Sequence, residues 1–283
     1  MDIENIFEIR NLHYSFSGKY TALSDVSFDI RRGERVVILG ANGSGKSSLL
    51  NILDGLTFPQ KGEVRFMGHT VSEDILKDEG FNRFFRNRVG FVFQNSDIQL
   101  FCSTVWDEIT FGPLHLDLHP DEVKTRVLEI SELLGIVKLW DRAPYQLSGG
   151  EKKKVAIAST IAVNPDVLLF DEPTNGLDPR SQAELVDFLE ILHKRGKTII
   201  TSTHDLNIAR MISDRAIVLN ECHGVETEGP TPAILEDTKI LLKVNLIHEH
   251  IHCHDGEMHR HPHGHLGDHA HEHKHGRGHR HEH

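Results

Sequence analysis

The most informative stretch of this sequence is Gly40-Ala41-Asn42-Gly43-Ser44-Gly45-Lys46-Ser47-Ser48. An apolar, β-branched run of strand length precedes it at 35–39, and residues 48–53 have a helical pattern. A strand, a glycine-rich turn and a Gly-Lys-Ser helix start are the context of a phosphate-binding P-loop. Glycine lets backbone N–H groups approach an oxyanion closely, and the helix N-terminus adds positive potential there. The sequence therefore predicts a nucleoside triphosphate site. A glycine-rich turn that merely connects a strand to a helix is the alternative.

Two side chains of the predicted P-loop have specific roles. Lys46 is expected to reach the β- and γ-phosphates, and the Ser47 hydroxyl is expected to bind Mg²⁺. The predicted nucleotide contacts of the loop are Gly40, Asn42, Gly43, Gly45, Lys46, Ser47 and Ser48.

A second part of the predicted site follows the apolar run at 167–170, which ends in Asp171 and Glu172. Ligand sites of parallel α/β sheets lie at the carboxyl ends of the strands. Asp171 is therefore expected to hold Mg²⁺, and Glu172 could position and deprotonate an attacking water. The alternative, a solvated turn with two carboxylates, is less favoured downstream of a P-loop.

Apolar runs of strand length alternate with helical patterns along the chain. This alternation predicts an α/β fold with a largely parallel sheet and crossover helices. The charged stretch at 72–88 is expected to be a surface helix or loop. The strand-like runs lie at 6–12, 22–30, 35–39, 63–68, 89–93, 167–172, 198–203 and 216–219, and the helical patterns at 48–53, 103–138, 152–163 and about 180–194.

Composition limits the classes of protein that this chain can represent. The 283 residues allow one or two domains, and a net charge of −11 argues against general nucleic-acid affinity. No apolar run approaches the roughly 18 to 20 residues that span a bilayer, and residues 1–5 lack the features of a signal peptide. Cys102, Cys222 and Cys253 show no paired spacing, which suits a reducing compartment. We therefore expect a cytosolic protein whose membrane role, if it has one, requires a partner.

Over about residues 5–230 the sequence resembles the ATP-binding subunits of ABC transporters. The Leu-Ser-Gly-Gly signature after a helical segment separates this family from kinases, GTPases and RecA-like ATPases. The resemblance implies a P-loop NTPase core with a mostly parallel sheet, an N-terminal antiparallel β subdomain and a helical signature subdomain at about 95–160, all within an ATPase domain at 1–247. It rests on the P-loop, Gln94, Leu147-Ser148-Gly149-Gly150-Glu151, Phe170-Asp171-Glu172-Pro173-Thr174, Gly176-Leu177-Asp178 and His204.

The resemblance also implies the partners and roles of individual residues. Two subunits, either two copies or two paralogues, would pair head to tail, with each ATP between one P-loop and the signature of the other subunit. A core or edge role for the aromatic Tyr14 is the alternative to its implied contact with adenine. The implied roles are adenine stacking by Tyr14, Mg²⁺ and water sensing by Gln94, general base catalysis by Glu172, γ-phosphate contact by His204, γ-phosphate binding in the other subunit by Ser148, Gly149 and Gly150, and an interface contact by Asp178.

The segment at 94–113 is similar to the ATPases of energy-coupling-factor (ECF) importers of the cobalt and nickel type, CbiO and NikO. That resemblance implies a peripheral subunit on the cytoplasmic face of the membrane, with a transmembrane coupling subunit and a substrate-binding membrane subunit as partners. In those ATPases this segment faces the coupling subunit. Its apolar residues, which could instead belong to the core, are Ile98, Leu100, Phe101 and Trp106.

The C-terminal 36 residues, 248–283, contain 15 of the 22 histidines. They include few apolar residues, so this tail is expected to be disordered alone. Neutral imidazole suits Ni²⁺, Co²⁺, Cu²⁺ or Zn²⁺, and binding should fail below about pH 6.5, where imidazole protonates. A purification tag or a solubilising tail is the alternative. The first candidate ligands are His248, His250, His252, Cys253 and His254.

Three functions are compatible with these features. The first is the ATPase subunit of a nickel or cobalt importer, in which ATP and Mg²⁺ act at the P-loop and Ni²⁺ or Co²⁺ binds the tail. The choice of nickel or cobalt follows from the resemblance, because imidazole alone would also bind copper and zinc. The second is the same ATPase role in an ECF-type importer of a vitamin or other small molecule. The third is a soluble metal-storage protein or a non-transport ABC ATPase.

Overall fold

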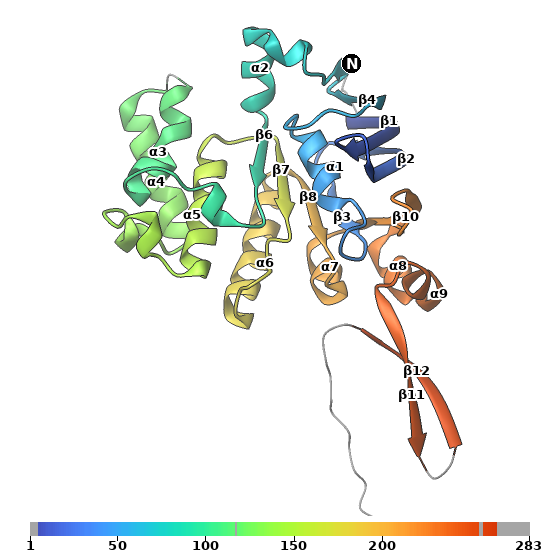
Figure 1. Ribbon diagram of the computed structural model, residues 1–283. Helices are drawn as coiled ribbons and strands as arrows, with labels where there is room; N and C mark the ends of the chain where they lie inside the picture. The colour runs from blue at the N-terminus through green and yellow to red at the C-terminus, as the bar shows by residue number, and fades with distance from the viewer. Residues whose placement is uncertain (1–4, 117, 255–256, 265–283) are drawn as a thin grey trace, which may run out of the picture.

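The computed structural model describes residues 5–116, 118–254 and 257–264 (Figure 1). Its centre is a six-stranded sheet with the strand order β10-β9-β3-β8-β7-β6, in which the pairs from β9 to β6 are parallel and β10 is antiparallel. The predicted α/β class with a mostly parallel sheet is confirmed. The strands of this sheet are β3 (Arg35–Leu39), β6 (Val89–Val92), β7 (Val167–Asp171), β8 (Thr198–Thr203), β9 (Arg215–Leu219) and β10 (Val225–Pro230).

Helices cover both faces of the six-stranded sheet, which explains why its inner strands are apolar almost throughout. Every residue of β7 and β8 is buried. The odd and even residues of β3 enter different cores: Val36 and Ile38 belong to the cluster around α1, and Val37 and Leu39 to the cluster around α7 to α9. These helices are α1 (Lys46–Leu53), α6 (Pro179–Lys194), α7 (Leu206–Ile212), α8 (Thr231–Glu236) and α9 (Thr238–Lys243).

The N-terminal part of the chain forms a second, antiparallel sheet with the strand order β2-β1-β4-β5. Its apolar face packs on α1, so that one core lies between the two sheets. The predicted antiparallel β subdomain is thereby confirmed. Its strands are β1 (Asn5–Phe16), β2 (Tyr20–Arg31), β4 (Lys61–Phe66) and β5 (His69–Thr70), and the helix α2 (Glu79–Arg86) follows within the charged stretch.

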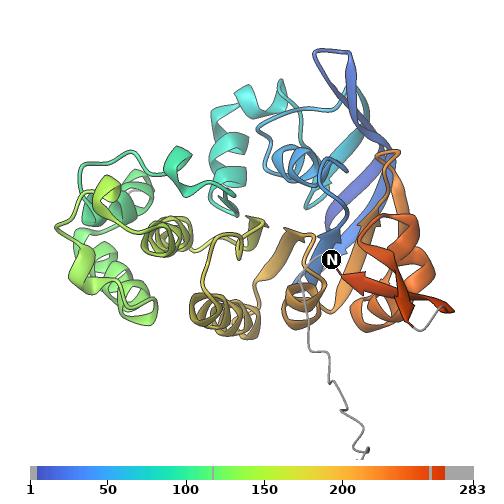
Figure 2. The same ribbon diagram turned by 60° about the horizontal axis from the view of Figure 1, so that its bottom comes forward.

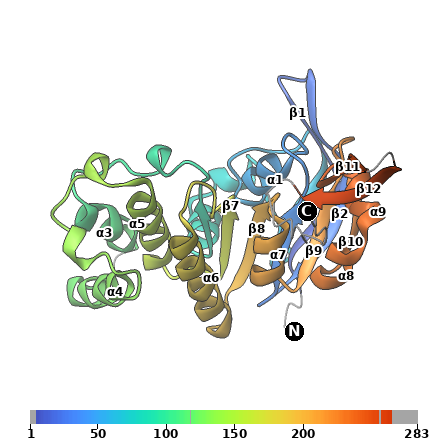
Figure 3. The ribbon, with the colours of Figure 1, turned by 90° about the horizontal axis from the view of Figure 1, so that it is seen from below.

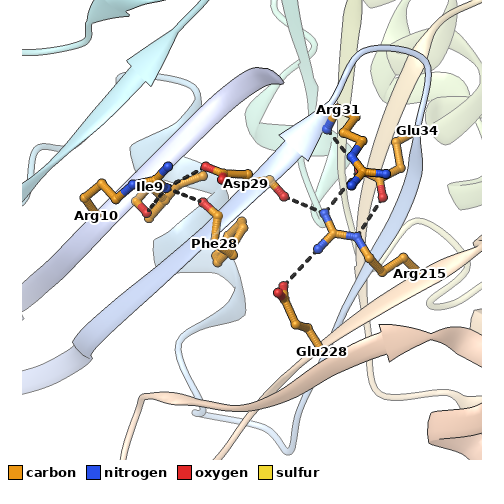
Figure 4. Close-up of polar contacts among 8 residues, drawn as sticks. All are labelled: Ile9, Arg10, Phe28, Asp29, Arg31, Glu34, Arg215 and Glu228. Carbon is orange, nitrogen blue, oxygen red and sulfur yellow. Dashed lines mark hydrogen bonds and ion pairs between the residues drawn. The ribbon is translucent and has the colours of Figure 1, made fainter. Parts of the chain in front are cut away.

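An arginine network joins the two sheets (Figure 4). Arg215 on β9 donates to the Asp29 carbonyl on β2, and its guanidinium lies 2.7 Å from Glu34 Oε1 and 2.9 Å from Glu228 Oε2. Arg10 on β1 donates to the side-chain carboxylate of the same Asp29. The Arg215 and Glu34 side chains are only 22% and 17% exposed, so solvent screens this pair less than a surface pair. The network therefore fixes β1 and β2 beside the edge of the central sheet.

The helices α3 (Val105–His115), α4 (Pro120–Leu133) and α5 (Gly149–Ala162) form a separate helical subdomain. Figures 2 and 3 show it at one end of the central sheet, with the antiparallel sheet at the other end. Ser148 begins α5 as a capping box: its Oγ accepts from Glu151 N, and its own N–H donates to Glu151 Oε2. The predicted helical signature subdomain is confirmed.

The C-terminal segment differs in part from the prediction of disorder. The structure has two antiparallel strands there, β11 (Ile247–His254) and β12 (Glu257–Gly264), which extend away from α9 (Figure 1). Histidine alternates with other residues along both strands, and Asp-Gly, a dipeptide that favours hairpins, separates them in the sequence. Residues 265–283 lie outside the described part of the chain, so their disorder remains a prediction. Within the described residues, no helix combines the length and apolar character needed to cross a bilayer.

Candidate functional site

A cavity of about 560 Å³ lies at the carboxyl ends of the parallel strands, where the P-loop leaves β3. Four segments contribute to it: the P-loop, the second residue after β6, the first residue after β7 and the first residue after β8. The predicted residues that line it are Asn42, Gly43, Gly45, Lys46, Ser47, Ser48, Gln94, Glu172 and His204.

The backbone of the P-loop is shaped by glycine. Gly45 has a φ of +107°, and a Cβ built on it would lie 2.1 Å from the carbonyl oxygen of Ala22. No other residue fits this conformation and this spacing. The loop therefore lies close against β2, and Asn42, Gly43 and Gly45 line the cavity at the start of α1.

The buried Lys46 ammonium links the loop to the carboxylate after β7. Its Nζ donates to the carbonyl oxygens of Gly40 and Ala41, at 2.8 and 3.2 Å, and lies 3.5 Å from Glu172 Oε1. Burial lowers the pKa of Lys46, whereas the nearby carboxylates of Glu172 and Asp171 raise it and partly offset this effect. Lys46 has a long, flexible side chain, so its ammonium can exchange these contacts for an anionic group in the cavity.

Asp171 is oriented by a residue that the sequence did not reveal. The Ser202 hydroxyl donates to Asp171 Oδ1 at 2.5 Å, and its oxygen, Ser202 Oγ, accepts from the Glu172 N–H at 3.1 Å. Ser202 lies opposite Asp171 in the β7–β8 register. One serine thus fixes both carboxylate-bearing residues, and Asp171 Oδ2 remains available to a cation.

Glu172 has an unusual backbone and a specific partner. Its φ of +43° lies in the left-handed region, which is strained for a residue with a side chain. The two hydrogen bonds to Ser202, from the Glu172 N–H to the carbonyl and to the hydroxyl, hold this conformation. His204 Nδ1 lies 2.9 Å from Glu172 Oε1. A strained, buried carboxylate that is oriented by a histidine is suited to general base chemistry.

The residues of the cavity fit a magnesium nucleotide. Ser47 lies at the cavity wall and Asp171 supplies a buried carboxylate, and Mg²⁺ prefers such oxygen ligands. Among the residues that the structure describes, none is a hydrogen-bond partner of the buried Ser44 hydroxyl of the same loop, as expected for a loop that surrounds a polar group. Ser47, Asp171 and Gln94 would hold Mg²⁺, and Lys46 with the P-loop amides would hold the phosphates.

The expected adenine contact requires a correction. Phe16, rather than Tyr14, lines the cavity, and Phe16 is 50% exposed. Tyr14 packs against the core between the sheets, with its ring 5.2 Å from the Phe16 ring in an edge-on arrangement. Both residues lie on β1, but Phe16 is the last residue of the strand, and its side chain is exposed there.

Of the predicted P-loop and magnesium residues, Gly40 and Asp171 do not line this cavity, and the signature residues and Asp178 lie outside it as well. Ser148, Gly149 and Gly150 are at the N-terminus of α5, and Gly150 lines a different cavity together with residues of α6. Asp178 caps its own helix, where its carboxylate accepts from Arg180 N and from the N–H and hydroxyl of Ser181. Within one chain, the structure therefore does not bring the signature to the P-loop.

A second buried lysine was also not predicted. Lys153 on α5 is only 4% exposed, and its Nζ donates to the backbone carbonyls of Phe93 and Gln94, at 3.1 and 2.7 Å. Burial lowers its pKa to about 8, with the Asp171 carboxylate opposing the shift. In the sequence it is the middle of three lysines, 152–154, and only the helical period of α5 shows that it faces inward.

An exposed apolar patch lies on the helical subdomain, on α3 and the loop that precedes it. We define the 98–114 patch as Ile98, Phe101, Phe111 and Leu114, which are 69, 68, 43 and 52% exposed. The rings of Phe101 and Phe111 meet edge-on at 5.0 Å. Of the residues proposed above for docking, Leu100 and Trp106 instead pack on the helical core. The Glu108 carboxylate accepts from the N–H groups of Phe101 and Cys102, at 2.9 and 2.7 Å, and so fixes the loop.

Comparison with known proteins identifies the family. A family model described as ABC transporter matches residues 23–175, and an ABC transporter ATP-binding protein of Methanosarcina acetivorans is 51% identical over 249 residues, which are 87% of this chain and 90% of that protein. The chain is an ABC transporter ATP-binding subunit. The nickel import ATP-binding protein NikO of Rhodobacter capsulatus is 41% identical over 244 residues, 85% of this chain and 95% of NikO.

A solved structure with the same fold adds to these relatives. The structure of CbiO1 from Clostridium perfringens, described as part of the ABC transporter complex CbiONQ, superposes with a TM-score of 0.73 at 34% identity, over 86% of this chain and 95% of that chain. The ABC ATPase described here therefore has the P-loop NTPase fold, binds ATP with Mg²⁺ and hydrolyses ATP.

Proposed function

We propose that this ABC ATPase is the energy-coupling subunit of an ECF-type importer of nickel or cobalt. The observation that carries the metal cargo is the histidine-rich C-terminal segment on an ATPase that is 41% identical to NikO. Residues 1–247 would form the ATPase domain and residues 248–283 a metal-binding tail.

The functional residues at the cavity have the following roles in this proposal. Glu172 accepts the proton of the attacking water, because its carboxylate is buried, held in position and next to His204. His204 contacts the γ-phosphate, and Lys46 neutralises the β- and γ-phosphates. Gln94 lies where it can orient the water, and Phe16 stacks on adenine. Mg²⁺ on Ser47 and Asp171 supplies charge neutralisation to the phosphates.

The position of the signature favours a head-to-tail dimer. Ser148, Gly149 and Gly150 present an exposed helix N-terminus away from the P-loop of their own chain. A helix N-terminus binds anions, so these residues suit the γ-phosphate in the site of a second subunit, identical or paralogous. Asp178 would lie at that interface.

The 98–114 patch is the proposed docking surface for the transmembrane coupling subunit, with a substrate-binding membrane subunit completing the importer. Exposed apolar residues in contact with one another favour an apolar helix as the partner. The loop is fixed by Glu108, so little ordering would be needed on binding. The ATPase would therefore lie on the cytoplasmic face of the membrane.

Phe101→Asp should weaken co-purification with the coupling subunit by about 10-fold or more, because a charge would enter an apolar contact. The amount of ATPase retained by the tagged coupling subunit in detergent measures this effect. Met211→Asp is the matched control, since Met211 is 50% exposed on α7, away from the patch. Equal retention of both variants would exclude the patch as the docking surface.

The backbone register of the tail hairpin supports the metal proposal. β11 and β12 pair His248 with His263, His250 with His261 and His252 with His259, while the pairs between them contain no histidine. Alternate residues of a strand share one face. Histidines therefore occupy one face of the hairpin backbone. Of the first candidate ligands, the side chains of His250, His252, Cys253 and His254 lie outside the described part of the structure.

Uptake of labelled Ni²⁺ and Co²⁺ tests the proposed function. Cells that express this chain with the membrane subunits encoded beside it should accumulate one of these ions, and Glu172→Gln should abolish the accumulation. Uptake that is absent for the wild type, with ATPase activity intact, would contradict the metal cargo. Labelled vitamins assayed in the same cells would then identify an ECF-type importer of a small molecule.

A further inference from the structure

The loop that carries Gln94 follows β6 in the chain, and its backbone is hydrogen-bonded to the signature helix α5. Gln94 lies two residues beyond the end of β6 and lines the nucleotide cavity. Its backbone carbonyl, however, accepts from Lys153 on α5 at 2.7 Å. One residue thus lines the nucleotide cavity and is bound through its backbone to the helical subdomain.

The preceding residue, Phe93, is linked to α5 both directly and through Gln99. The Phe93 carbonyl accepts from Lys153 at 3.1 Å, and the Phe93 N–H donates to Gln99 Oε1 at 3.1 Å. Gln99 in turn donates to the Ala156 carbonyl and to the Thr160 hydroxyl, at 3.2 and 3.0 Å. A further ion pair joins Lys152 to Asp97 at 2.6 Å, but its carboxylate is 64% exposed.

Burial makes the Lys153 contacts the strongest of these attachments. An ammonium that is 4% exposed loses its water, and hydrogen bonds from a charged donor are stronger than those between neutral groups. By contrast, the exposed Lys152–Asp97 pair contributes little, because solvent screens it. A residue in the second turn of the signature helix therefore controls the position of the Gln94 backbone.

We propose that Lys153 is a positioning residue that fixes Gln94 to the signature helix, so that Gln94 moves with Ser148, Gly149 and Gly150. A movement of the signature helix would thus be transmitted to the Gln94 backbone through the Lys153 side chain. Docking at the 98–114 patch, on the same subdomain, would then be coupled to the water-positioning residue through one buried side chain. This inference rests on the role proposed for Gln94.

Lys153→Met removes the donors and retains the length of the side chain. We expect ATP turnover to fall by about 10-fold or more, since a small misplacement of a positioning group has effects of this size. The affinity for a fluorescent ATP analogue should stay within about two-fold, because no P-loop contact is lost. Hydrogen exchange of the backbone at 93–99 should become faster without any nucleotide. The matched control is Lys154→Met, which removes the ion pair of the next lysine with Glu184.

A double-mutant cycle separates positioning of Gln94 from a general effect on the fold. If Lys153 acts through Gln94, the variant with both Lys153→Met and Gln94→Ala should turn over no more slowly than Gln94→Ala alone. Effects that multiply, unchanged hydrogen exchange at 93–99, or an equal loss in Lys154→Met would each overturn the proposal. An unimpaired Gln94→Ala would remove the role of Gln94 itself and this inference with it. Metal uptake by the wild type tests the cargo separately from these outcomes.

Discussion

Glu172→Gln should retain ATP binding and lose hydrolysis by at least about 100-fold, because the amide cannot accept the proton of the attacking water. The substitution preserves the shape of the side chain. The backbone hydrogen bonds from the Glu172 N–H to Ser202 do not involve the side chain, so they should keep the left-handed conformation of residue 172. Single-turnover hydrolysis and equilibrium binding of a fluorescent ATP analogue measure the two quantities separately.

The same substitution removes the negative charge that faces Lys46 at 3.5 Å and His204 at 2.9 Å. ATP binding should therefore become equal to or tighter than that of the wild type, because a carboxylate no longer competes with the phosphates for the Lys46 ammonium. Glu184→Gln is the control, since Glu184 is an exposed residue of α6. Turnover of Glu172→Gln near the wild-type rate would exclude Glu172 as the base.

The P-loop and the carboxylates after β7 could be predicted from sequence because local patterns specify them. The P-loop is specified by contiguous residues, since its glycine-rich turn lies directly between a strand and a helix. The two acids directly follow an apolar run of strand length, which places them at the end of that strand. Ser202 could not be found in this way. Its role depends on β8 lying next to β7 with Asp171 opposite Ser202, and no local pattern encodes this neighbour relation.

Whether Tyr14 or Phe16 contacts adenine depends on which of the two side chains is buried by the packing of β1. Two residues that share a strand face have the same periodicity, and only the packing of β1 shows that the second is 50% exposed at the cavity. Leu100 and Trp106 illustrate the same limit, because apolar residues of the helical subdomain divide into core and patch only after α3 and α5 pack. Lys153 was hidden for the opposite reason, since a run of three lysines has the pattern of a solvated face.

Deletion of 248–283 should abolish tight binding of Ni²⁺ and Co²⁺ to the purified protein and leave its basal ATP turnover within about two-fold, since it removes 15 imidazoles and no residue of the nucleotide cavity. Isothermal titration at pH 7.5 measures the stoichiometry. Repetition at pH 5.5 should eliminate binding to the full chain as well, because imidazole is protonated below about pH 6.5 and the cation cannot bind a metal. A full metal stoichiometry in the truncated protein would move the site elsewhere.

The register of the hairpin allows a sharper test than deletion. Exchange of His250 with Ile251 keeps the composition of the tail but replaces the His250–His261 pair with an isoleucine opposite His261. If paired positions on one face form the sites, the exchanged chain should bind fewer ions or bind them more weakly than the wild type. An isolated two-stranded hairpin is marginally stable in water, so metal bound across the strands should also increase its β-structure signal in circular dichroism. Equal titrations of the two chains, without a change in that signal, would show that histidine content alone is sufficient.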